Sequence, residues 1–246
     1  MLRSRFIPVL LLDEGELVKT RKFDEGIYVG DPINAIRIFN EKVVDELSLF
    51  DISATSNGYE IDFELLKDIA VNANMPLTYG GGIRTVETAA KIISLGFEKI
   101  SISSVLFENE NLIREVTSEI GTQSLVVCLD VKKINNEYLI FTHRGKKKAP
   151  LSLINTLKIF EKYPVGEIVI NSIDRDGTFQ GYDFELAKLI RGLSTVNLSI
   201  LGGCKDINDF IELEKLIGIC GCAAGSYFTF FGKNNAVLLN YNKPTT

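Results

Sequence analysis

The stretch Pro76-Leu77-Thr78-Tyr79-Gly80-Gly81-Gly82-Ile83 decides the fold of this chain. A short apolar run ends in three glycines, and a helical pattern then opens with Thr85 in the position of a cap. This order predicts a strand, a tight loop and a helix N-terminus. Because glycine lets the backbone approach a ligand closely, the N–H groups and helix dipole of such a junction can bind an anion.

The same device returns later in the chain. Gly202-Gly203 follows the apolar run 196–201 and precedes a helical pattern over residues 205–216. Gly81 and Gly202 lie 121 positions apart, almost half of the 246 residues, and the same offset places Glu46 on Glu167. Such a repeat predicts two pseudo-symmetric half-barrels with two anion sites on opposite sides of one mouth.

Strand-like runs alternate with helical patterns along the whole chain. The expected strands are residues 5–12, 47–52, 77–79, 99–103, 125–129, 168–171, 198–201 and 219–223. The expected helices are residues 31–43, 63–73, 86–95, 111–120, 151–160, 184–193, 207–216 and 227–239. Eight strand-plus-helix units without a linker predict one α/β domain over residues 1–246, a (β/α)₈ TIM barrel. A doubly wound sheet is the alternative, but it requires neither eight units nor a repeat.

Two segments interrupt this alternation. Residues 13–30 are expected to form a long polar loop, which could close over bound phosphate as a lid. Residues 132–148 form an insertion in which Asn135-Asn136 separates two short alternating runs. That pattern predicts a β-hairpin.

Composition excludes several classes of function. A net charge of −5 leaves no excess of basic residues to neutralise nucleic acid or an anionic membrane surface. No apolar run is long enough to span a bilayer or to form a signal peptide, so a cytoplasmic protein is expected. The four cysteines lie in or beside apolar stretches and the chain has one histidine. We therefore expect packed, free thiols, with no metal site and no cofactor.

The barrel prediction selects candidate site residues, because the active sites of such barrels lie where the strands end. Asp130 follows the apolar strand 125–129 and is the candidate catalytic acid or base, since burial can raise the pKa of a carboxyl group toward neutrality. The alternative is a structural aspartate paired with Lys132. His143 lies in the insertion, far in sequence from any nucleophile at a strand end, so a catalytic triad is not expected.

The candidate substrate-binding and phosphate-binding residues share positions at strand ends or in adjoining loops. They are Lys19, Asp51, Gly81, Gly82, Ser103, Ser104, Asn171, Asp176, Gly177, Gly203, Gly225 and Ser226. For Asp176-Gly177, a simple tight turn competes with ligand binding. Two glycine pairs in matching places make a phosphorylated small-molecule ligand the favoured interpretation.

The chain also resembles a known family over essentially its whole length. The matching motifs are Ile7-Pro8, Val18-Lys19, Gly30-Asp31-Pro32, Asp45-Glu46-Leu47, Phe50-Asp51-Ile52, Gly80-Gly81-Gly82-Ile83, Lys99-Ile100-Ser101-Ile102, Gly145-Lys146-Lys147 and Ser172-Ile173-Asp174-Arg175-Asp176-Gly177-Thr178. They resemble the cyclase subunit of imidazole glycerol phosphate synthase. The resemblance implies a substrate with two phosphates, a glutaminase partner docked on the amino-terminal face of the barrel, and ammonia entering through its interior.

The resemblance assigns a charged ring at the bottom of the barrel as the ammonia gate. Its members correspond to Arg5, Glu46, Lys99 and Glu167, each at the start of an expected strand. From the residues alone, charges at this face indicate a stabilising layer of ion pairs. The two interpretations are compatible, because a ring of ion pairs can be both a plug and a gate.

The expected pocket departs from the family pattern. The cyclase uses two aspartates, and this chain keeps one as Asp130 but has Leu11 at the position of the other. Leucine exchanges no proton, and Asp13 could replace the missing group only if the strand slipped. Leu201 and Asn171 also stand where the family has small hydroxyl residues. The pocket is therefore expected to differ in its chemistry.

This combination resembles cyclase-like paralogues that act with a glutaminase and a third, sugar-modifying protein in bacterial surface-polysaccharide synthesis. The resemblance implies a synthase subunit that delivers ammonia for amidation of a sugar precursor. Three alternatives stay open: an authentic histidine-pathway cyclase, a non-catalytic phosphate-binding scaffold that activates the glutaminase, and a related sugar-phosphate isomerase. Leu11 weakens the isomerase alternative, because those barrels also rely on paired carboxylates.

Overall fold

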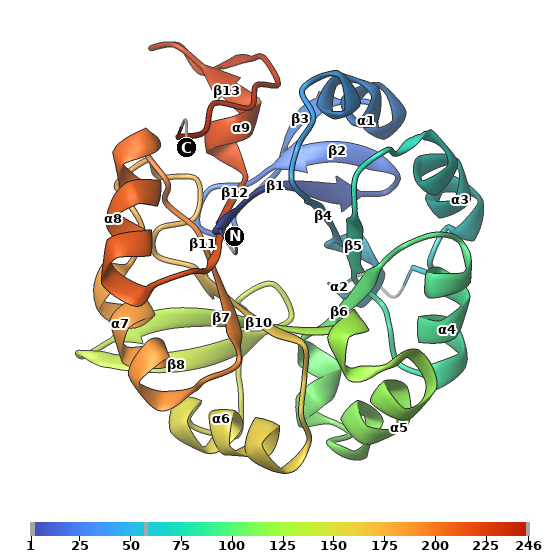
Figure 1. The fold of residues 1–246 in the computed structure, drawn as a ribbon, viewed down its shortest axis with the longest axis vertical. Coiled ribbons are helices and arrows are strands. Elements are labelled where there is room, and N and C mark those ends of the chain that lie inside the picture. The colour runs from blue at the N-terminus through green and yellow to red at the C-terminus, as the bar shows by residue number, and fades with distance from the viewer. Residues whose placement is uncertain (1–2, 57–58, 245–246) are drawn as a thin grey trace.

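Eight parallel strands close into a barrel at the centre of the computed structural model, which describes residues 3–56 and 59–244 (Figure 1). The barrel strands are β1 (Arg5–Asp13), β4 (Leu47–Asp51), β5 (Leu77–Gly80), β6 (Lys99–Ile102), β7 (Leu125–Ile134), β10 (Glu167–Ser172), β11 (Asn197–Leu201) and β12 (Gly221–Ala224). The ring closes because β7 pairs with β10 and β12 pairs with β1. The (β/α)₈ barrel expected from the sequence is confirmed.

Helices cover the outside of this barrel, as Figure 1 shows. They are α1 (Pro32–Glu41), α3 (Phe63–Asn72), α4 (Val86–Ser94), α5 (Asn111–Ile120), α6 (Leu153–Lys162), α7 (Phe184–Leu193) and α8 (Ile207–Ile217). Most begin at a side-chain cap: Asp31, Thr85 and Ser152, for example, each accept a hydrogen bond from a backbone N–H in the first turn. These caps satisfy N–H groups that otherwise lack a partner and fix where each helix starts.

The strands are buried on both faces, which explains their almost continuous apolar sequences. Outward-facing side chains such as Tyr79 and Leu49 join the helices in the larger core. Inward-facing side chains form a second, smaller core inside the barrel. Its buried members are Ile7, Val9, Val126, Cys128, Val169, Leu201 and Ala223.

The prediction of a polar loop over residues 13–30 is wrong. The chain turns at Glu14 and Gly15, whose φ angles are 52° and 83°, and returns along β1 as β2 (Glu16–Lys19). A further antiparallel strand, β3 (Ile27–Gly30), pairs with β2. Burial of the adjacent residues Leu17 and Val18 of β2 outweighs the polar character of the segment, and Lys19 is fixed on a strand.

The strand that carries Asp130 runs further than expected. β7 continues past the barrel and pairs with β8 (Glu137–Thr142) through a turn at Asn135 and Asn136, whose φ angles are 48° and 65°. A short strand, β9 (Lys147–Lys148), then pairs with β8. Asp130 therefore lies within a strand, opposite Asn171 on one side and Phe141 on the other, and not at a strand end.

The prediction of a final helix over residues 227–239 is also wrong. Only the four residues of α9 (Ser226–Thr229) are helical, and a small hairpin of β13 (Phe230–Phe231) and β14 (Ala236–Val237) follows. Gly232 and Asn235 have φ angles of 75° and 48°, values that end a helix and suit a turn. The turn residues outweigh the apolar periodicity there.

The glycine junctions come to lie across the barrel from each other. In the order of hydrogen-bonded strands, β11, β12, β1, β4 and β5 follow one another, so four steps around an eight-strand ring separate β11 from β5. Gly81-Gly82 follows β5 and Gly202-Gly203 follows β11. The two junctions therefore occupy opposite sides of the barrel mouth.

Candidate functional site

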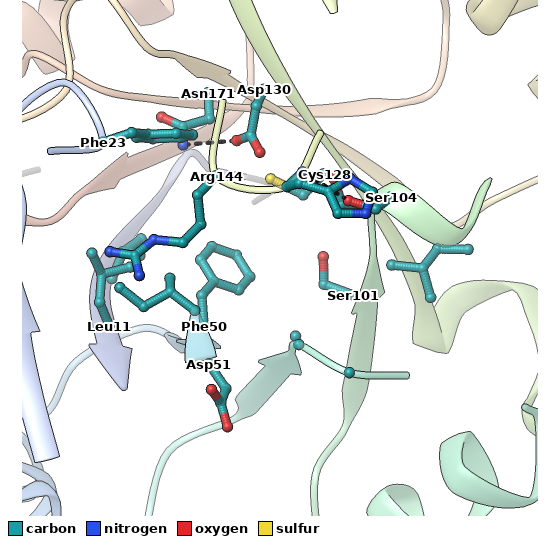
Figure 2. A pocket seen from close by; sticks show the side chains of 18 of the residues that line it. Leu11, Phe23, Phe50, Asp51, Ser101, Ser104, Cys128, Asp130, Arg144 and Asn171 are labelled. Atoms are coloured by element: carbon teal, nitrogen blue, oxygen red, sulfur yellow. Dashed lines mark hydrogen bonds between the residues drawn. The ribbon is translucent and has the colours of Figure 1, made fainter. Parts of the chain in front are cut away.

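A pocket opens at the carboxyl ends of the barrel strands and collects most of the candidate residues (Figure 2). Those lining it are Lys19, Asp51, Gly81, Gly82, Ser103, Ser104, Asp130, Asn171, Asp176 and Gly225. Gly177, Gly203 and Ser226 line a smaller hollow beside it, and this hollow shares Asp176 and Gly225 with the pocket. The residues chosen from the sequence thus form one continuous region.

Asp130 lies on the pocket wall beside Asn171 (Figure 2). The Asn171 Nδ2 atom donates a hydrogen bond of 3.1 Å to Asp130 Oδ1. Burial raises the pKa of Asp130 to about 7, against the lowering effect of this hydrogen bond, and the charge of Asp176 adds to the rise. A carboxyl group with such a pKa can exchange a proton at neutral pH.

Asn171 contributes a second feature to the same wall. Its side chain is buried, and its Oδ1 atom has no hydrogen-bond partner among the described residues. An unpaired acceptor in a buried position is costly unless a ligand supplies a donor. The Oδ1 atom itself is fully buried, so Asn171 positions Asp130 through its hydrogen bond and does not itself meet the ligand.

Lys19 is buried at the opposite wall, where its Nζ donates a hydrogen bond to the Val9 carbonyl. Burial lowers the pKa of Lys19 to about 8, and the charge of Asp176 partly opposes that change. A Cβ on Gly225 would lie 2.6 Å from Nζ, so glycine at that position makes room for the lysine. Lys19 is thus fixed in this wall, and its ammonium group loses its proton around pH 8.

Gly81 and Gly82 adopt positive φ angles of 130° and 67° at the junction after β5. A Cβ on Gly81 would lie 2.4 Å from the carbonyl oxygen of Asp51, a distance at which a side chain cannot fit. Ser103 and Ser104 continue the same wall, where the short 3₁₀ helix η1 (Ser104–Phe107) begins. At this wall an anion can come close to the backbone N–H groups, as an anion site requires.

The carboxylate of Asp51 already has several donors. Its Oδ1 accepts hydrogen bonds from the N–H and hydroxyl of Ser53, at 2.9 and 2.7 Å, and from the N–H of Ala54 at 3.0 Å. Tyr79 Oη donates to the other oxygen at 3.3 Å. Asp51 thus caps the short helix α2 (Ser53–Ser56), and direct ligand binding by its carboxylate stays a prediction.

Two pocket residues were missed because they come from the insertion. His143 and Arg144, at the tip between β8 and β9, line the pocket. The His143 N–H donates to Ser104 Oγ at 3.3 Å, and its Nδ1 lies 3.0 Å from the Thr142 hydroxyl. The hairpin folds back over the mouth, a long-range contact that spacing along the chain does not reveal.

Leu11 lies on the apolar side of the pocket with Phe50, as Figure 2 shows. In the parallel and antiparallel ladders it is opposite Phe50 and Val18, so β1 neither bulges nor slips there. Asp13 does not line this pocket. The structure therefore offers no carboxylate from β1 in the place of the leucine side chain.

The four ring residues form a closed network at the other end of the barrel. Lys99 Nζ lies 3.0 Å from Glu46 Oε1 and 2.9 Å from Glu167 Oε2, and Arg5 Nη2 lies 2.8 Å from Glu167 Oε1. Arg5 also pairs with Glu46. Burial alone would raise the pKa of Glu167, but its hydrogen bond and charge interaction with Arg5, together with Lys99, hold that pKa below the usual value.

A small cavity inside the barrel lies between the ring and the pocket. Its lining includes Glu46 and Glu167 from the ring, and Val9 and Phe50 from the pocket wall. The hydroxyl groups of Ser48, Thr78 and Ser199 complete its polar side. Its size suits a molecule no larger than about one water.

The cysteines take no part in a metal site in the described structure. All four are free and buried, and the sulfur atoms of Cys220 and Cys222 lie 3.9 Å apart. Within residues 3–56 and 59–244, no three His, Cys, Asp or Glu side chains are grouped as metal ligands would be. Among the same residues, no helix has both the length and the apolar character needed to cross a bilayer.

Comparison with known proteins places this geometry in a family. Residues 5–234 match the family described as "Histidine biosynthesis protein". A Vibrio vulnificus protein named "Putative imidazole glycerol phosphate synthase subunit hisF3" is 48% identical over all of this chain and 95% of its own length. A Leptospira interrogans protein named as a putative HisF subunit is 46% identical, with 98% of this chain and 96% of the relative covered.

The name of a third relative lacks the word "Putative". The imidazole glycerol phosphate synthase subunit HisF of Sulfolobus acidocaldarius is 38% identical, with 92% of this chain and 91% of the relative covered. Barrel, pocket and ring are thus found in a chain whose relatives match it nearly from end to end. The chain belongs to the histidine biosynthesis protein family and, within it, to the HisF-like subunits of imidazole glycerol phosphate synthase.

Proposed function

We propose that this chain is the synthase subunit of a glutamine amidotransferase pair. It receives ammonia from a glutaminase docked on the amino-terminal face of the barrel and delivers it to a phosphorylated sugar precursor in the pocket. The observation that carries the proposal is the continuity of charged ring, small cavity and pocket, which share lining residues in that order. A relative named as a subunit of imidazole glycerol phosphate synthase supports a partner chain, and the resemblance implies that this partner is a glutaminase.

The interior of the barrel suits a small neutral molecule. Val9 and Phe50 line both the cavity and the pocket, so the two spaces are separated only by side chains. Ammonia is as small as water and can exchange hydrogen bonds with the hydroxyls of Ser48, Thr78 and Ser199. The ring must open for passage, because its four members are joined by ion pairs.

In the pocket, Asp130 is the group that moves a proton. The lone pair of the ammonia nitrogen forms a bond to a carbonyl carbon of the acceptor, whose C=O π pair moves onto its oxygen, and a proton leaves that nitrogen for the Asp130 carboxylate. Asn171 holds the Asp130 carboxylate in place through the 3.1 Å hydrogen bond from its Nδ2. Leu11 supplies no acid or base, so amination proceeds with Asp130 and without a paired carboxyl group from β1.

The phosphate of the acceptor is bound at the glycine junctions. Gly81, Gly82 and Ser104 offer one site, and Gly177, Gly203 and Ser226 offer the other across the mouth. The assignment to a sugar precursor of surface polysaccharide, with a third sugar-modifying protein as recipient, rests on Leu11 and on the resemblance to cyclase-like paralogues. The product would be an amidated sugar.

An authentic cyclase of histidine biosynthesis is the second candidate. The elevated pKa of Asp130 and the 38% identity to the Sulfolobus acidocaldarius subunit favour it. In this candidate Asp130 acts without a partner carboxylate. The two candidates differ in whether the histidine-pathway ribonucleotide is turned over.

Steady-state turnover of that ribonucleotide with ammonium separates them. The first candidate predicts no turnover by the natural chain and measurable turnover by Leu11→Asp, which restores the paired carboxylates. Turnover by the natural chain at a rate that Leu11→Asp does not raise would overturn the first candidate and establish the second. Co-purification with a HisH-type glutaminase is expected for both.

A further inference from the structure

Arg144 is held over the pocket in an unusual backbone conformation. His143, Arg144 and Gly145 have φ angles of 52°, 56° and 73°, three left-handed residues in succession. The left-handed region costs a non-glycine residue on the order of 1 kcal/mol or more, so contacts must stabilise it. The Lys146 N–H donates to the His143 carbonyl at 3.2 Å, and Phe23 packs against Gly145.

The guanidinium that this turn presents has one ion-pair partner among the described residues, at the limit of contact. Its nearest carboxylate oxygen, Asp13 Oδ2, lies 4.0 Å from Nη1, and its side chain is only 22% exposed. In the described part of the chain it makes no hydrogen bond. Arginine carries five N–H donors in a planar fork, and that fork matches the two oxygens of a carboxylate.

Arg144 lies beside an uncharged side chain of the pocket wall. Leu11 and Asp13 share one side of β1, because alternate strand residues face the same way, so a guanidinium that approaches Asp13 lies beside Leu11. Figure 2 shows Arg144 reaching toward the Leu11 side of the pocket. Among the described residues Asp13 is its one ion-pair partner, at 4.0 Å, and Leu11 offers it none.

We propose that the acceptor carries a carboxylate besides its phosphate and that Arg144 binds this carboxylate above Leu11. The inference deepens the proposed function and rests on it. An aspartate in place of Leu11 would pair with Arg144, whereas leucine leaves the hydrogen-bond donors of Arg144 to the ligand. The phosphate is bound by the glycine junctions, so Arg144 determines specificity for the second anionic group.

The test compares two compounds that differ only in this group. They are 6-phosphogluconate, which has a carboxylate at carbon 1, and glucitol 6-phosphate, which has a hydroxymethyl group there. Isothermal titration of the full chain at pH 7.5 should give at least about tenfold tighter binding of 6-phosphogluconate, the range of a charge-assisted hydrogen bond. Arg144→Gln should remove this preference and leave the affinity for glucitol 6-phosphate unchanged.

Two further variants serve as controls for this test. Lys146→Gln removes a cation from the same turn, but Lys146 is exposed and does not line the pocket, so the preference should persist. Leu11→Asp should reduce the preference, because its carboxylate competes for Arg144. Equal binding of the two compounds by the natural chain, or an undiminished preference in Arg144→Gln, would overturn this inference alone. Binding of neither compound would overturn the proposed phosphate site and this inference with it.

Discussion

At the scale of single residues, the pocket changes the acid–base behaviour of two buried groups in opposite directions. Burial disfavours charge on both, so the pKa of Asp130 rises to about 7 while that of Lys19 falls to about 8. Near neutral pH, each group is therefore close to its own transition. Their protonation states should be visible both in stability and in ligand binding.

Asp130→Asn should make the stability of the protein less dependent on pH. The folded state binds the Asp130 proton more tightly than the unfolded state, whose carboxyl has its ordinary value near 3.8. The free energy of unfolding of the natural protein therefore falls as the pH rises from about 4 to about 7. Asparagine does not titrate. The free energy of unfolding of Asp130→Asn, relative to that of the natural protein, should therefore rise by about 2 to 3 kcal/mol between pH 5 and pH 8. Urea denaturation at both pH values measures it, and a constant difference would refute the argument.

Lys19 should make phosphate binding weaken in alkaline solution. A sugar phosphate is fully charged above pH 7, whereas Lys19 loses its proton around pH 8. Between pH 7 and pH 9 we expect the affinity for glucitol 6-phosphate to fall by about tenfold, as the protonated fraction does. In Lys19→Met, binding should be weaker and nearly independent of pH over that range. A natural chain whose affinity stays constant would show that Lys19 does not bind the phosphate.

Pocket residues that belong to a local sequence pattern could be predicted from the sequence. Pocket residues that a folded-back loop brings in could not. The strand–glycine–helix pattern identified Gly81 and Gly82, and the apolar run before Asp130 identified that carboxylate; both line the pocket. His143 and Arg144 enter it only because the hairpin tip reaches Ser104. The unpaired oxygen of Asn171 likewise depends on packing and has no signature in the sequence.

At the scale of elements, side chains outside the barrel strands join neighbouring units. Asp183 caps α7 by accepting from the Leu186 N–H at 3.0 Å, and it also accepts from Tyr138 Oη of β8 at 2.9 Å. One carboxylate thus fixes both the helix start and the hairpin that carries Arg144. Asp62 caps α3 through the Leu65 N–H at 2.9 Å.

Replacement of Asp183 by alanine should cost more than replacement of Asp62. Each change removes a cap worth about 1 kcal/mol, but Asp183→Ala also removes the tyrosine hydrogen bond, for a further cost of about 1 kcal/mol. Urea denaturation of both variants gives the comparison. In a Tyr138→Phe background the two costs should become similar. Equal costs in the natural background would mean that the Tyr138 contact contributes nothing.

The element predictions failed where turn residues were underrated. Apolar periodicity located the barrel strands and the seven covering helices, but Glu14-Gly15 converts the expected loop into a strand pair. Gly232 and Asn235 likewise replace the expected last helix by a hairpin. In both segments a tight turn allows local antiparallel pairing, which competes with the αβ alternation of the rest of the chain.

At the scale of the whole molecule, the two faces of the barrel carry different surfaces. The mouth holds the pocket, while the opposite face holds the ion-paired ring and the segments that precede the strands. Ile219, which precedes β12, is exposed on that side. Ile27, on the outer strand β3, is exposed away from it. These two isoleucines allow a matched comparison of docking on one face.

The rate of glutamine hydrolysis by a HisH-type glutaminase, measured with and without this chain, tests the proposed pairing most directly. Docking on the ring face should raise the rate by about tenfold, within the usual range of coupling between sites. Ile219→Glu should reduce that stimulation, and Ile27→Glu should leave it intact. A chain that never changes the glutaminase rate, or that loses its effect only through Ile27→Glu, would contradict the account.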